Sequence, residues 1–294
     1  MPLLTASRSL WFPVVLLLVA MVSIQTGAAL AKTLFPALGA VGVSALRLGL
    51  AALLLCAIMR PWRGGWPGLH SCRSLLVYGL ALGGMNMLFY QALERVPLGI
   101  AVALEFTGPL AVALCSSRRV LDVVWVALVA LGLWLLLPVG ATQAPIDPLG
   151  AAFALAAGGC WALYIIYGRK AGTDHGSRTV ALGTVVAALM AMPIGVAQLG
   201  SELFVPALLP VALAVAVLST ALPYSLEMVA LRRMPSRTFS MLMSLEPAVA
   251  AMSGLIFLSE RLTPLQWLAV LSIIVAAAGA AQTSRPVMAK RAER

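Results

Sequence analysis

The chain has 294 residues, of which 62% are hydrophobic and only 10% charged, and its mean hydropathy is +1.00. Apolar runs of about twenty residues, the length that crosses a lipid bilayer as a helix, recur along the whole sequence. This composition excludes a water-soluble globular domain. It also argues against a membrane β-barrel, whose strands alternate polar and apolar residues in segments of about ten.

The apolar runs predict an all-α polytopic membrane protein with ten transmembrane helices. Their expected bounds are Phe12–Ala31, Ala40–Met59, Ser74–Ala92, Leu98–Ser117, Val120–Leu137, Leu149–Tyr167, Thr179–Leu199, Pro206–Leu231, Thr238–Leu258 and Leu265–Ala281. The first run also resembles a secretory signal. Because it exceeds the usual apolar length of a signal, about 7 to 15 residues, we expect it to remain as the first helix.

The formal net charge of +10 is compatible with nucleic-acid binding, but the placement of the charges argues against it. Sixteen of the twenty Lys and Arg residues lie on alternate loops and at the termini, three lie on the intervening loops, and Arg47 lies within a span. The positive-inside rule then places both termini in the cytoplasm. We expect the lipid bilayer, and no nucleic acid, as a partner. The basic tail 284–294 either lies over anionic lipid headgroups or is solvated and functionless.

The two halves of the chain show a short internal repeat at an offset of 138 residues, at which Leu93–Pro97 aligns with Leu231–Pro235. Each unit holds five expected spans, an odd number, so the second unit threads the membrane in the opposite direction. We therefore expect a first repeat at 1–140 and an inverted repeat at 141–283, the usual plan of secondary transporters, with the substrate site between the repeats near the midplane. Chance similarity between apolar segments is the alternative.

Two prolines superpose at the same offset, Pro109 and Pro247. A proline inside a helix removes the hydrogen bond to the carbonyl four residues earlier, so these prolines free the carbonyls of Glu105 and Met243. At membrane depth such carbonyls persist only when they are buried in protein or line a wet cavity. We expect both helices to be broken here, with a plain structural kink as the alternative.

Ionisable side chains inside the expected spans are the main site candidates, because a charge at the bilayer centre costs about 2.5 to 3.5 kcal/mol on insertion scales. Arg47 either pairs with Glu105 or binds the carboxylate of a zwitterionic substrate, whose ammonium a glutamate would receive. A permanent ion pair without substrate contact is the alternative. Glu246 is the better candidate for proton binding, since loss of water disfavours a charged carboxylate. Glu227, near the inner loop, is expected to reach the headgroups instead.

Further polar and aromatic residues are expected around the path, whereas the fifth and tenth spans contain almost nothing polar and are expected to face lipid. These further candidates are Gln25, Asn86, Tyr90, Trp161, Tyr164 and Tyr224. Small residues predict close helix contacts at Gly79, Gly83 and Gly158–Gly159.

Signatures of enzymes are missing from the sequence. The two histidines fall in expected inner loops and the four cysteines lack metal-ligand spacing, so we expect no metal, cofactor or catalytic residue. No phosphate-binding GxxxxGK[ST] motif occurs, which excludes ATP hydrolysis as the energy source. Coupling to an ion gradient, with protons as the expected ion, or downhill exchange remains.

Three stretches carry a resemblance to a known family, namely Ala101–Leu110, Leu218–Glu227 and Met243–Ala248. They resemble the drug/metabolite transporter superfamily, EamA type, over about Trp11 to Ala281. The resemblance implies ten spans in two inverted repeats, a central cavity, a bacterial inner-membrane location and efflux of small neutral amino acids such as threonine and homoserine. It assigns no substrate contacts.

Two other functional classes remain open at this point. A transporter of larger cargo, such as a nucleotide sugar or a cationic drug, would need aromatic side chains around an acidic group. A membrane scaffold without transport would carry its charges inside the spans at a needless cost. The sequence gives no indication of oligomeric state.

Overall fold

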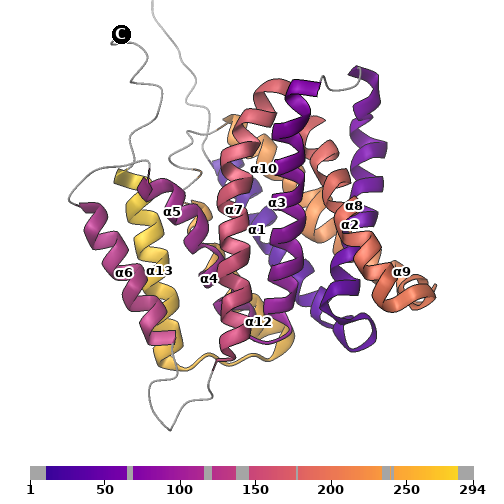
Figure 1. Ribbon diagram of the computed structural model, residues 1–294. Helices are drawn as coiled ribbons and strands as arrows, with labels where there is room; N and C mark the ends of the chain where they lie inside the picture. Colours follow the sequence, from indigo (N-terminus) through magenta and orange to yellow (C-terminus); the bar gives the residue numbers. More distant parts are fainter. Residues whose placement is uncertain are drawn as a thin grey trace, which may run out of the picture.

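The fold is that of a computed structural model in which residues 11–64, 69–115, 121–136, 146–176, 178–233, 239 and 242–283 are described. Within these residues the regular structure is entirely helical, and the helices form one bundle (Figure 1). The basic tail 284–294 lies outside the described residues, as do the expected helix ends Ser117, Val120, Leu137 and Thr238.

The helices follow the expected order along the chain. Their bounds are Trp11–Lys32 (α1), Phe35–Met59 (α2), Leu69–Leu93 (α3), Leu98–Glu105 (α4), Thr107–Cys115 (α5), Leu121–Leu136 (α6), Pro148–His175 (α7), Arg178–Leu199 (α8), Leu209–Ala216 (α9), Leu222–Arg233 (α10), Glu246–Leu258 (α12) and Pro264–Thr283 (α13). Three short turns complete the list, with Pro61–Gly64 (η1) and Gly200–Phe204 (η2) as 3₁₀ helices and Val217–Ala221 (η3) as a π-helix.

The described residues include six helices that are long and apolar enough to cross a membrane, together with four shorter apolar ones. The surface of the bundle carries many exposed large apolar side chains, among them Leu53, Val123, Leu189 and Ile256. Such side chains distributed over several helices form an apolar exterior that suits lipid rather than water. The chain is therefore a multi-pass membrane protein.

Both helices that were expected to break do so beside their prolines. The expected span Leu98–Ser117 is divided at Phe106, so that α4 ends at Glu105 and α5 begins before Pro109. In the second half, Ser244 and Leu245 form a turn, and α12 then begins at Glu246, one residue before Pro247. The chain thus has an interruption beside each of these two prolines.

Other helix bounds differ from the expected ones for local reasons. The span Pro206–Leu231 is divided, because the π-helical η3 separates α9 from α10. Helix α2 begins earlier than expected and contains a kink at Gly39, whose φ of 61° and ψ of 171° suit glycine. Helix α7 continues past Tyr167 to His175, which was expected in a loop, and ends where Gly176 adopts a φ of 60°.

Helices distant in the sequence pack side by side. Helix α3 contacts α7 and α8, α2 contacts α8 and α9, α1 contacts α10 and α12, and α4 contacts α7 and α12. Helices α6 and α13 pack on each other at one edge of the bundle, on the left in Figure 1. Helix α6 exposes Val124 and Trp134, whereas α13 also packs against α4, α5 and α12. The expected lipid-facing position thus holds for α6 and for one face of α13.

Glycines allow the closest helix contacts, and one of them covers the break after α4. Gly79 and Gly83 of α3 lie against α8, as their spacing predicted. On α7, a Cβ atom at Gly158 would lie 2.5 Å from the carbonyl oxygen of Glu105, the oxygen that Pro109 leaves free in its helix. A Cβ atom at Gly108 would in turn collide with the backbone of Gly158. The freed carbonyl is therefore buried against backbone.

We expect Gly108→Ala and Gly158→Ala each to destabilise the folded protein by about 1 to 3 kcal/mol, because the added methyl group must push two backbones apart. Thermal unfolding of the purified protein in detergent measures the effect. Gly159→Ala is the matched control, because no atom lies within 4 Å of a Cβ atom there. Equal unfolding midpoints for all three variants would contradict the close contact.

Candidate functional site

The predicted site residues gather in the interior of the bundle, although they come from helices throughout the chain. Six of the nine are buried, namely Gln25, Arg47, Asn86, Tyr90, Glu105 and Glu246. The other three, Trp161, Tyr164 and Tyr224, are half-buried. We use the name polar layer for the buried polar side chains of α1, α2, α3, α4, η3, α10 and α12 that meet here.

Gln25 and Glu246 join the two halves of the chain in the polar layer. The Gln25 Nε2 group of α1 donates a hydrogen bond of 3.2 Å to Glu246 Oε1 of α12. The remaining side-chain oxygens of both residues are buried and have no protein partner. Glu246 is also the first residue of α12, where the positive end of the helix dipole favours a carboxylate.

Arg47 of α2 is held by an aromatic ring rather than by a carboxylate. Its guanidinium carbon lies 4.8 Å from the centroid of the Tyr90 ring on α3, a cation–π contact. Neither the Arg47 Nε atom nor the Tyr90 hydroxyl makes a hydrogen bond of ordinary geometry, although the Tyr90 hydroxyl interacts with the side chains of Arg47 and Ser219. Among the described residues, no ion pair joins Arg47 to Glu105. The structure therefore lacks the permanent pair that was one of the alternatives for Arg47.

Glu105 ends α4 at the break in that helix. Its carboxylate interacts electrostatically with both Glu246 and Arg47, so the three ionisable candidates from the sequence share one region. Phe106, the next residue, meets Trp161 of α7 edge to face, with ring centroids 5.4 Å apart and planes at 89°. Trp161 thus packs against the helix break beside the polar layer.

The remaining predicted residues are partly engaged in packing. Asn86 donates from Nδ2 to the Leu82 carbonyl of its own helix over 2.7 Å. Tyr164 of α7 stacks on Tyr78 of α3, with centroids 4.7 Å apart. Tyr224 of α10 interacts electrostatically with Arg47 and therefore remains near the charged groups.

Sequence reasoning missed two residues of the polar layer, Ser44 and Ser219, and counted Thr220 among the polar residues of its span without making it a site candidate. The outward position expected for Glu227 is wrong, because its Oε1 atom is buried without a partner and the carboxylate interacts with Glu246. The sequence contains an indication of the inward position of Glu227. Thr220, Tyr224 and Glu227 are spaced four and three residues apart, which places them on one face of a helix.

Unpartnered polar atoms are concentrated in this layer. Among the described side chains, the buried nitrogen and oxygen atoms without any hydrogen-bond partner are Gln25 Oε1, Ser44 Oγ, Arg47 Nε, Tyr90 OH, Ser219 Oγ, Thr220 Oγ1, Glu227 Oε1 and Glu246 Oε2. An unsatisfied buried polar group costs about 1 to 3 kcal/mol. All eight belong to helices that contribute to the polar layer, and groups of this kind can bind a small polar ligand.

One end of the bundle is closed by charged contacts between the two halves. Lys32 of α1 lies 2.6 Å from Glu260, whose other oxygen accepts from the Leu98 backbone N–H at the start of α4. Arg95 lies 3.1 Å from Asp147. The pKa of the Asp147 carboxyl is lowered from its usual value, mainly by the hydrogen bond from the Leu149 backbone N–H and next by the hydrogen bond from Arg95.

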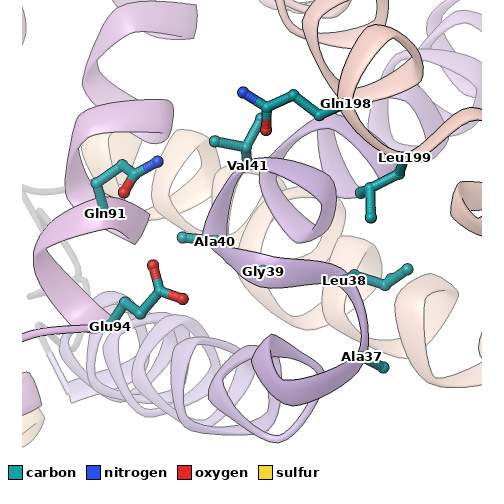
Figure 2. Close-up of a pocket in the computed structure, with 9 residues that line it drawn as sticks. All are labelled: Ala37, Leu38, Gly39, Ala40, Val41, Gln91, Glu94, Gln198 and Leu199. Carbon is teal, nitrogen blue, oxygen red and sulfur yellow. The ribbon is translucent and has the colours of Figure 1, made fainter.

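A separate cavity of about 330 Å³ lies between α2, α3 and α8 near the Gly39 kink. In Figure 2, Gln91 of α3 and Glu94 in the turn after it border the cavity on one side, and Gln198 and Leu199 of α8 border it on the other. None of the predicted site residues lines this cavity.

Comparison with known proteins identifies the family. A sequence profile of the EamA-like transporter family matches residues 148–281. The threonine/homoserine exporter RhtA of Salmonella typhimurium is 57% identical and is aligned over 97% of this chain and 96% of its own length. The chain belongs to the EamA-like transporter family. RhtA of Escherichia coli is 58% identical over 94% of this chain and 93% of its own length.

A solved crystal structure shares the fold of this EamA-like transporter, with a TM-score of 0.55 and 20% identity over 94% of this chain and 97% of that chain. The relatives with curated names are transporters, so the prediction of a transporter rather than an enzyme is confirmed. The family resemblance expected from the sequence is confirmed as well.

Proposed function

We propose that the chain exports small neutral amino acids, threonine and homoserine foremost, from the cytoplasm. The observation that carries this proposal is the set of unpartnered polar atoms in the polar layer, which includes a cation, two carboxylates and several hydroxyls. A small zwitterion with a side-chain hydroxyl has complementary groups for each of them. The relatives named threonine/homoserine exporter support the same substrates.

Arg47 is the proposed partner of the substrate carboxylate. Guanidinium groups bind carboxylates through directed hydrogen bonds, and the Arg47 Nε donor is unused in the structure. Glu105, which shares the region with Arg47, is the proposed partner of the substrate ammonium. Glu246 is left as the proposed proton site, with Gln25 as its hydrogen-bond donor. The polar layer would then bind a zwitterion and a proton side by side.

Helix packing supports an inverted repeat. If α1, α2, α3, α4 and α6 exchange places with α7, α8, α9–α10, α12 and α13, then the most extensive contacts between helices have counterparts. The contact of α3 with α7 becomes that of α10 with α1, and the contact of α4 with α7 becomes that of α12 with α1. The pairs α2 with α8, α4 with α12 and α6 with α13 map onto themselves. We infer ten spans in two inverted units related by a pseudo-twofold axis, and one unit would rock against the other during transport.

The direction of transport follows from the proposed orientation. With both termini in the cytoplasm of a bacterium, the Lys32–Glu260 and Arg95–Asp147 contacts lie at the outer end of the bundle. Because each contact joins one unit to the other, release of the substrate outward requires both to separate. Protonation of Glu246 from outside would accompany the return step, so that the proton gradient drives export.

Wild-type cells are expected to lose labelled homoserine several-fold faster than cells that lack the gene, because the polar layer provides a route for a zwitterion that lipid alone does not. The measurement is the efflux rate after preloading with radiolabelled homoserine. Equal rates in the two strains would discard the proposed function.

Arg47→Gln and Glu105→Gln are each expected to reduce homoserine efflux at least about tenfold, because each removes a charge that pairs with the zwitterion. The double variant is expected to be no better than either single one. Arg261→Gln, a change at an exposed position, is the control and should export normally. Substantial export by the double variant would remove both residues from the mechanism.

A further inference from the structure

We propose that the π-helical turn η3 determines specificity, with the hydroxyls of Ser219 and Thr220 binding the side-chain hydroxyl of the substrate. This inference rests on the proposed function, and it assigns recognition of hydroxyl-bearing amino acids to two uncharged residues. Both lie in an irregular piece of backbone in the middle of the eighth expected span.

The turn Val217–Ala221 is wider than the helices on either side of it. The Leu222 backbone N–H donates to the Val217 carbonyl, five residues earlier, whereas an α-helix uses the carbonyl four residues earlier. Single π-helical turns within α-helices are rare and occur frequently at functional sites. The wider turn therefore changes the directions in which the side chains of Ser219 and Thr220 leave the helix.

Helix α1 holds this turn in place. Ser23 donates from Oγ to the Leu218 carbonyl over 2.8 Å. Four residues later on the same face, Gly27 lies against the Ser219 side chain and backbone, so closely that a Cβ atom at position 27 would overlap Ser219. The position of the turn is therefore set by its packing against α1, where the hydroxyl oxygen of Ser219 is the atom closest to Gly27.

Hydroxyls elsewhere in the bundle are used differently. Thr184 and Ser272 donate to a carbonyl four and three residues earlier in their own helix, each at 2.8 Å, and Ser225 of α10 donates to the Ala221 carbonyl at 2.7 Å. This is the ordinary way in which a helix satisfies such side chains. Ser219 and Thr220 are 4% and 2% exposed, and neither hydroxyl makes a hydrogen bond of ordinary geometry within the protein, although the Ser219 hydroxyl interacts with Tyr90. Each hydroxyl can therefore bind a ligand.

The pair lies next to the groups proposed to bind the zwitterion. Ser219 is beside the Tyr90 hydroxyl, and the Tyr90 ring lies 4.8 Å from the Arg47 guanidinium. A substrate with its carboxylate on Arg47 would need only a short side chain to reach the turn. Valine has the shape of threonine without the hydroxyl and would leave the buried pair unsatisfied. A site that is built to bind a hydroxyl rejects such an analogue.

The test compares threonine with valine, and homoserine with norvaline, as competitors of labelled homoserine transport in proteoliposomes. Wild type is expected to prefer the hydroxylated member of each pair. In Thr220→Val and Ser219→Ala this preference is expected to fall about five- to tenfold, as for the loss of one hydrogen bond. Thr184→Val is the matched control, since its hydroxyl is already satisfied within α8, and its preference should equal that of wild type.

Gly27→Ala gives a second route to the same result, because the added methyl group displaces the turn without removing a hydroxyl. If a variant does not transport, the stabilisation of the purified protein against heat by threonine and by valine replaces the transport readout. An unchanged preference in Thr220→Val, Ser219→Ala and Gly27→Ala overturns the inference. Failure of wild type to transport homoserine at all would instead overturn the proposed function.

Discussion

Everything else in this structure depends on the need of polar groups at membrane depth for hydrogen-bond partners. In an apolar bundle, a buried side chain that can form hydrogen bonds must find a partner or destabilise the fold. Some buried polar side chains meet that requirement within their own helix, as Thr184 and Ser272 do, and others bond to a neighbouring helix, as Thr179 does. The polar layer is the exception, and its helices come from both ends of the sequence. We propose that the point where these unpartnered groups meet is the binding site.

Irregular backbone brings these groups to the centre. The break at Phe106 ends α4 on Glu105, the break before Pro247 begins α12 on Glu246, and the π-helical turn presents Ser219. Two of the three irregularities are covered by a close contact, since Gly158 lies against the first and Gly27 against the third. Packing thus buries the irregular backbone at these two places, whereas the side chains remain available for a ligand.

The sequence predicted the parts of the fold that depend on composition and on single residues. Apolar runs located the helices, and Pro109 and Pro247 located both breaks because proline removes a specific hydrogen bond. The π-helical turn was missed, because nothing in its composition distinguishes it from an α-helical segment. Glu227 was misplaced, since distance from a loop along the chain does not reveal which helix face is buried. The contact of Arg47 with Tyr90 depends on the packing of α2 on α3, which a sequence alone does not specify.

The central claim is that the polar layer forms a water-accessible chamber that receives the substrate. Cys160 is a natural reporter, because it is only partly buried and interacts electrostatically with Glu105. With Cys56, Cys72 and Cys115 changed to serine, the most direct measurement is the rate at which a small hydrophilic thiol reagent modifies Cys160 in membranes. A chamber predicts that Cys160 reacts and that homoserine slows the reaction while norvaline does so far less. Absence of reaction, or a rate that homoserine leaves unchanged, would contradict the chamber.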